Sequence, residues 1–178
     1  MNRPGTWLRM GVFGITGGIL TLFCLAAPIL PAETRVPDEV ISLAGIDRVQ
    51  VRVRPVAPLL SQRGVTAKLI KRELEAGLER AGIEVVEDKD VPTLEVKSLP
   101  VNDPAIPDAM AFDIQMSLYQ SVHVGRLNRK LVVPTYMDVN IALDRNEKIE
   151  DAAIACIDDV LGRFGEAVRV ATRRVEEE

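Results

Sequence analysis

The chain has 178 residues, a length typical of one domain, and its 47% hydrophobic and 27% charged residues are typical of a folded protein. Only 4% of the residues are aromatic, so a core has to be built mainly from aliphatic side chains. The formal net charge of −4 argues against sequence-independent nucleic-acid binding, because such binding depends on clustered lysine and arginine.

Residues 1–32 predict an export signal or a membrane anchor. Two arginines precede the uncharged run 10–30, as in a secretory signal. As a helix this run would be roughly 32 Å long, close to the ~30 Å hydrocarbon thickness of a bilayer. We favour cleavage near Ala32 over retention as an uncleaved anchor, and lipidation at Cys24 is a third route. All three routes export the rest of the chain, to the periplasm or another part of the cell envelope.

The exported part is expected to consist of a tether, residues 33–46, and one domain, residues 47–178. In "DRVQVRVRP" the valines alternate with polar residues, which predicts a strand with one buried face. The run 65–81 carries leucine and isoleucine at spacings of three and four, which predicts an amphipathic helix that ends at Gly82.

Four more strands and a closing helix follow in the predicted domain. "IEVVE" is a short strand, and "TLEVKSL", "AFDIQMSLYQSVHV" and "YMDVNIALD" alternate like strands buried on one side. The last of these is expected to point Met137, Val139, Ile141 and Leu143 inward. An apolar stripe over 149–175 predicts the final helix. The fold class is therefore α+β, a two-layer α/β sandwich of order β-α-β-β-β-β-α, with a mostly antiparallel sheet of about five strands and two helices on one face.

This pattern resembles that of small exported bacterial α/β domains, namely the lipopolysaccharide-assembly lipoproteins and the N-terminal domains of TolB proteins. The stretches that carry it are "RVQVRVRPV", "LIKRELEAGLERAGIEVVE" and "IACIDDVLGRFGEAV". The resemblance implies a partner in envelope assembly rather than an enzyme.

The polar side of the predicted sheet is the main candidate for a functional surface. Polar faces of antiparallel sheets are often merely solvated, but in an exported domain such a face can dock a partner. The hairpin 112–144 is expected to contribute, and strand 112–124 could template an added strand if it lies at a sheet edge. The residues predicted to contact an unknown envelope protein are Arg52, Gln115, Tyr119, Ser121, His123 and Asn140.

An alternative partner is a lipid component of the envelope. Arg126, Arg129 and Lys130 cluster in the loop of the predicted hairpin, where they could contact anionic headgroups. The run 10–30 would then serve as the membrane tether of a single-pass protein.

A second alternative is a small hydrolase that uses Asp113, Asp138 and His123. An open sheet face offers these groups neither desolvation nor charge pairing, which acid–base catalysis needs to shift a pKa. The sequence also has no catalytic, metal-binding or nucleotide-binding motif, so neither a metal nor a cofactor is expected. The prediction is a non-catalytic binding protein.

Overall fold

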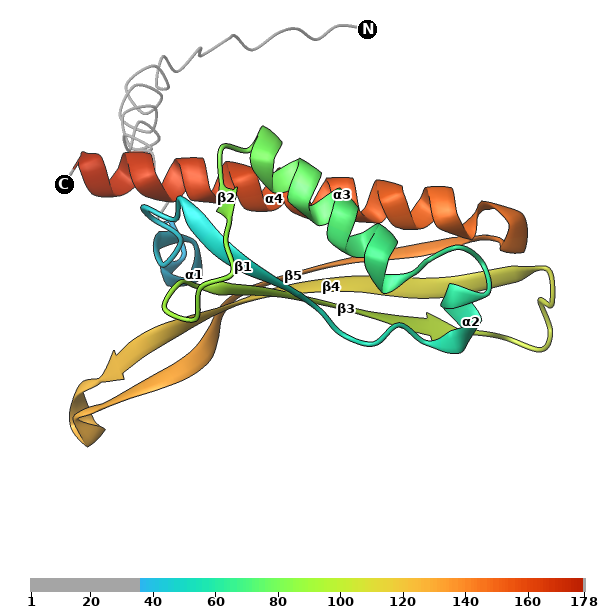
Figure 1. Ribbon diagram of the computed structural model, residues 1–178, viewed down its shortest axis with the longest axis horizontal. Coiled ribbons are helices and arrows are strands. Elements are labelled where there is room, and N and C mark those ends of the chain that lie inside the picture. The colour runs from blue at the N-terminus through green and yellow to red at the C-terminus, as the bar shows by residue number, and fades with distance from the viewer. Residues whose placement is uncertain (1–35, 178) are drawn as a thin grey trace, which may run out of the picture. The chain divides into compact units, whose positions relative to one another are not determined.

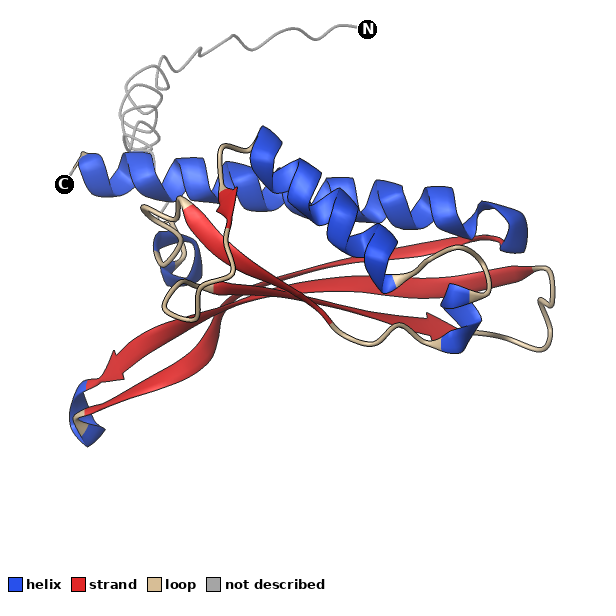
Figure 2. Cartoon of the chain, in the orientation of Figure 1, coloured by secondary structure: helices blue, strands red, loops and turns tan. Residues whose placement is uncertain are grey.

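Five strands and two long helices dominate the part of the chain that the computed structural model describes, residues 36–177 (Figures 1 and 2). In chain order the elements are α1 (Asp38–Ile41), β1 (Arg48–Val53), α2 (Pro58–Ser61), α3 (Ala67–Arg80), β2 (Glu84–Val85), β3 (Thr93–Val101), β4 (Ala109–Val124), the 3-10 turn η1 (Gly125–Leu127), β5 (Arg129–Arg145), the 3-10 turn η2 (Asn146–Lys148) and α4 (Ile149–Glu176). The predicted α+β fold and its element order are confirmed. Within these residues no helix is long and apolar enough to cross a bilayer. The predicted leader, with Cys24, lies outside the described residues.

The sheet has the strand order β2-β1-β3-β4-β5. Strand β1 pairs in parallel with both β2 and β3, whereas β3–β4 and β4–β5 are antiparallel. The sheet is therefore mixed rather than mostly antiparallel. The second parallel pair arises because the chain, after pairing Val85 with Val49, crosses to the other side of β1 and pairs Thr93 with Gln50.

One face of the sheet is covered by α3 and α4, and the core lies between these two layers (Figure 2). Thr66 caps the start of α3, since its Oγ1 accepts a hydrogen bond from the Leu69 amide at 3.1 Å. Gly82 ends the helix with a φ of +76°, which glycine adopts without strain. Fully buried side chains of the sheet and the helices meet in the core, among them Leu74, Leu78, Val96, Phe112, Ile114, Met116, Ile157, Val160 and Phe164.

Residues 36–46, most of the predicted tether, pack against the rest of the described unit. Leu43 is fully buried in the core, and the Gly45 amide donates to Thr172 Oγ1 of α4 at 3.2 Å. The sequence did not indicate this packing, because a single buried leucine in a polar stretch gives no periodic pattern.

The predicted inward face of β5 was wrong. Two of its helix-facing positions are polar, since Asp138 lies opposite Met116 and Asn140 lies opposite the buried Ile114 in the β4–β5 register. Helix α4 supplies partners for both: Arg163 Nε donates to Asp138 Oδ2 at 2.7 Å, and Asn140 Nδ2 donates to Asp159 Oδ2 at 3.0 Å. The apolar positions of β5 consequently lie on the opposite side of the sheet.

Beyond the first residue of β3, Thr93, the hairpin of β4 and β5 continues as a two-stranded arm, residues 120–133. The last β3–β4 pair is Thr93 with Tyr119, whereas β4 and β5 stay paired to the turn. The extra residue at Thr135 produces a bulge at the base of the arm. Figure 1 shows the arm bending away from the helices. The predicted loop is therefore mostly strand, and only the turn around Gly125–Leu127, followed by Asn128 with a φ of +46°, is irregular.

Candidate functional site

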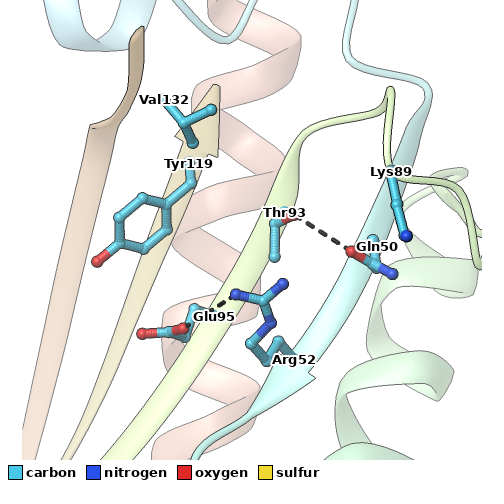
Figure 3. A pocket seen from close by; sticks show the side chains of 7 residues that line it. All are labelled: Gln50, Arg52, Lys89, Thr93, Glu95, Tyr119 and Val132. Carbon is cyan, nitrogen blue, oxygen red and sulfur yellow. Dashed lines mark hydrogen bonds and ion pairs between the residues drawn. The ribbon is translucent and has the colours of Figure 1, made fainter. Parts of the chain in front are cut away.

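The face of the sheet opposite α3 and α4, called the open face here, carries a shallow hollow of about 250 Å³ (Figure 3). It is lined by Gln50, Arg52, Lys89, Thr93, Glu95, Tyr119 and Val132. Alternation along β1, β3 and β4 places Gln50, Arg52, Thr93, Glu95 and Tyr119 on this face. Lys89 comes from the loop before β3, and Val132 comes from β5. Arg52 Nη1 lies 3.8 Å from Glu95 Oε2, and Thr93 Oγ1 lies 3.4 Å from Gln50 Oε1.

Glu95 is shared by two arginines, because Arg54 Nε also lies 3.7 Å from its Oε1. The two arginine side chains are more than half exposed, whereas the Glu95 side chain is only 17% exposed. Exposed pairs of this kind contribute little to folding. The guanidinium groups keep donors available, so the hollow is suited to hydrogen bonds with a docked polar group.

An apolar band lies next to the hollow on the open face. Two cross-strand rows form its centre: Leu99, Asp113 and Ile141 in one, and Val101, Ala111 and Leu143 in the other. We define the band by its large exposed side chains, which are Leu99, Val101, Met137, Val139, Ile141 and Leu143. Between 48% and 72% of each is accessible to solvent. Asp113 interrupts the first row, whereas the second row is apolar throughout. Clusters of exposed apolar side chains of this kind often mark an interaction site.

The band adjoins the free edge of the sheet, because β5 is the last strand in the order. The backbone edge is partly masked at its two ends. The Val139 amide donates to the Asp138 carboxylate at 2.7 Å, and the Arg145 amide donates to the Asp144 carboxylate at 2.7 Å. On an edge strand every second residue presents both backbone groups outward, so Ile141 presents its N–H and C=O between these masked ends.

Most of the predicted partner-contact residues lie where the open face or the arm can present them. Arg52 and Tyr119 line the hollow, and Gln115 lies beside the apolar band, where its side-chain amide donates to Met137 Sδ. On the arm, Ser121 and His123 are exposed.

Asn140 is the exception among these predicted contact residues. It was predicted to lie on the polar face, but the register of β5 turns it toward α4, where it bonds to Asp159. Asp138 and Asp144 lie on the same side of β5 as Asn140, opposite the buried Met116 and Met110 of β4.

The three residues of the hydrolase alternative are not brought together. Asp113 lies on the open face and accepts a hydrogen bond from the Leu99 amide at 2.9 Å. Asp138 lies on the helix side and is paired with Arg163, and this hydrogen bond raises the pKa of the guanidinium. His123 is exposed on the arm. Within residues 36–177, no group of three or more His, Cys, Asp or Glu side chains could hold a metal ion.

The three predicted lipid-contact residues gather at the end of the arm. Arg126 lies in η1, whereas Arg129 and Lys130 begin β5, and all three are exposed. No ion pair joins them to another described residue.

The apolar band was missed by the sequence reasoning, although one feature indicates it. In "TLEVKSLPV" the buried Leu94 and Val96 are in one phase, and Leu99 and Val101 are in the other. A strand with apolar residues in both phases has an apolar patch on its exposed side as well as on its buried side.

Comparison with known proteins identifies structural neighbours only. No family model and no curated protein matches the sequence. The chain is similar to a minor lipoprotein from Acinetobacter baumannii, with 12% identity and a TM-score of 0.43 over 74% of this chain and 95% of that one. It is also similar to the rare lipoprotein B from Shewanella oneidensis, with 10% identity and a TM-score of 0.41 over 72% of this chain and 98% of that one. Both of these neighbours are bacterial lipoproteins, the class of protein that the sequence pattern resembles.

Proposed function

We propose that this protein is an exported, non-catalytic binding protein of the bacterial cell envelope, which docks a protein partner on its open face and on the free edge of β5. The observation that carries the proposal is the apolar band beside an edge strand whose backbone groups are open at Ile141. Such an edge can accept an added strand, whose backbone provides affinity while its side chains cover the neighbouring apolar surface.

The geometry favours a partner strand of short length. The masked amides at Val139 and Arg145 limit the accessible stretch of the edge, and the apolar band continues from it onto β3. The hollow around Arg52 adds a polar rim to this surface. An interface of ordinary size needs roughly 800 Å² on each partner, and a surface that spans β1, β3, β4 and β5 can supply this area.

The export part of the proposal rests on the leader sequence. A reporter that is active only outside the cytoplasm, fused behind Glu33, should be active in cells. An inactive fusion at normal expression would refute export. Sequencing the N-terminus of the mature protein separates cleavage near Ala32 from retention of the anchor.

The docking part can be tested by in-cell photo-crosslinking. A photoreactive residue at Leu143 or Tyr119 should give a discrete adduct with another envelope protein, whereas the same residue at the exposed Lys68 on α3 should not. The mass of the adduct distinguishes a second copy of the chain from a different protein. Equal labelling at all three positions would contradict a specific docking face.

A pair of substitutions at Ile141 tests strand addition. Ile141→Pro removes an amide that points away from β4, so the β4–β5 ladder keeps its hydrogen bonds. Ile141→Ala shortens the side chain but keeps the amide. We expect the crosslink from Leu143 to be lost in the proline variant and only weakened in the alanine variant. Equal loss in both would show that the side chain, not the edge, carries the contact.

A further inference from the structure

We infer that the arm, residues 120–133, is a membrane-contacting element that inserts its apolar tip into the surface of a bilayer containing anionic phospholipid. The inference does not require the partner proposed for the open face, although Val132 of the arm also lines the hollow there. It rests on the apolar surface of the arm, on its charge and on its position at one end of the domain.

The arm is apolar without contributing to the core. Its exposed apolar side chains are Val122, Leu127, Leu131 and Val132, with exposed fractions from 36% to 72%. None of them belongs to the core cluster of the described residues. The register places Val122 opposite Leu131, so these two share one side of the hairpin, and Leu127 occupies the turn. An isolated two-stranded hairpin gains little from such side chains in water.

The charge of the arm is opposite to that of the protein. No acidic residue occurs between Asp113 and Asp138, whereas Arg126, Arg129 and Lys130 stand within five residues of one another at the tip. The whole chain has a formal net charge of −4. Cations around an apolar tip match the surface of an anionic bilayer, where the long basic side chains reach the phosphates while the tip enters the interface.

The arm is also fastened at its base, which allows it to present the tip in a defined direction. Gln120 Nε2 donates to the Ser42 carbonyl at 3.0 Å and to Thr135 Oγ1 at 2.8 Å. These bonds join the arm to the segment after α1. Figure 1 shows the tip projecting beyond the other elements of the described unit, so a flat surface can reach it without a clash with the helices.

The test uses the purified protein with one tryptophan at the tip. Trp7→Phe removes the natural tryptophan, and Leu127→Trp introduces a reporter at an exposed position. With phosphatidylglycerol vesicles, we expect a blue shift of the emission and quenching by brominated acyl chains. Phosphatidylcholine vesicles should cause neither change. A retained leader would hold the protein on both kinds of vesicle. The difference in tryptophan emission between phosphatidylglycerol and phosphatidylcholine vesicles therefore reports the arm alone.

Two controls make the result specific. The same reporter introduced by Lys68→Trp on α3 should show no change with either lipid. Combined Arg126→Gln, Arg129→Gln and Lys130→Gln should lower the ratio of docked to free arm by about a hundredfold, since each cation near an anionic surface contributes about fivefold. Raising the salt from about 0.1 M to about 1 M shortens the Debye length from about 10 Å to about 3 Å and should also release the arm. Two results would overturn the lipid assignment and leave the arm as a protein contact. One is an emission that is the same with phosphatidylglycerol vesicles as in buffer, and the other is an emission that does not respond to the three substitutions.

Discussion

The truncations Ile114→Ala and Ile141→Ala test which face of the sheet is buried. The chemical change is the same, but Ile114 on β4 is fully buried under the helices, whereas Ile141 on β5 is 72% exposed. Truncating a buried isoleucine destabilises a protein by about 2–5 kcal/mol, because the transfer energy is lost and a cavity is left. Only about a quarter of the Ile141 surface is covered. Full burial of an isoleucine side chain stabilises a protein by about 1.5–3 kcal/mol, so truncating Ile141 should cost only about 0.5 kcal/mol of hydrophobic stabilisation. The lower strand propensity of alanine can add up to about 1 kcal/mol.

Urea unfolding followed by circular dichroism gives the free energy of unfolding of each variant. We expect the midpoint to fall strongly for Ile114→Ala and slightly for Ile141→Ala, with the same slope against urea for both. If Ile141→Ala costs as much as Ile114→Ala, β5 is packed with its apolar residues inward and the apolar band does not exist. That result would also remove the basis for docking at this edge.

Three further predictions concern the core, the buried thiol and metal independence. Val51→Asp should unfold the domain, because it places an unpaired charge at a position that is 7% exposed, whereas Gln50→Asp on the open face should leave the melting temperature nearly unchanged; equal effects would contradict the phase of β1. In a Cys24→Ser protein, Cys156 should react with a thiol reagent slowly until urea unfolds the domain, since burial both shields the thiol and raises its pKa; rapid labelling of the folded protein would contradict this packing. A chelator should leave the thermal midpoint unchanged, and a large drop would reveal a metal that couples to folding.

The elements were predictable from the sequence where local patterns are strong. The helix of α3 has both an amphipathic period and a glycine stop, and β1 has strict alternation, so their bounds agree with prediction within a few residues. The strand order could not be predicted in this way. It depends on the crossover of the chain between β2 and β3, and no local sequence pattern indicates that crossover. The burial of Leu43 likewise could not be predicted, because it depends on tertiary contacts with the core. Among the predicted contact residues, Arg52, Gln115 and Tyr119 lie on the open face, whereas their contact with a partner stays a prediction.

The phase of β5 shows why alternation alone was insufficient. "YMDVNIALD" alternates equally well whichever side is buried, and a shift of one residue in register exchanges the two faces. The register with β4 changes by one residue at the bulge near Thr135. The side of β5 that faces the helices therefore depends on where the bulge lies in the strand, and not on the hydrophobicity of its residues.

The observed register exposes the apolar side of β5, which burial of hydrophobic surface alone would disfavour. The register is supported instead by polar contacts on the helix side. Arg163 donates to both carboxylate oxygens of Asp138, at 2.7 and 3.1 Å, a bidentate geometry that the pair of Arg52 and Glu95 lacks, and Asn140 bonds to Asp159. Tyr136 adds a ring contact with Phe164, whose centroid lies 5.6 Å away. A strand held in this way keeps Ile141 and its apolar neighbours in solvent in the free protein. Covering that surface with a partner would release hydrophobic free energy, which is the physical reason for proposing a docking site at this edge.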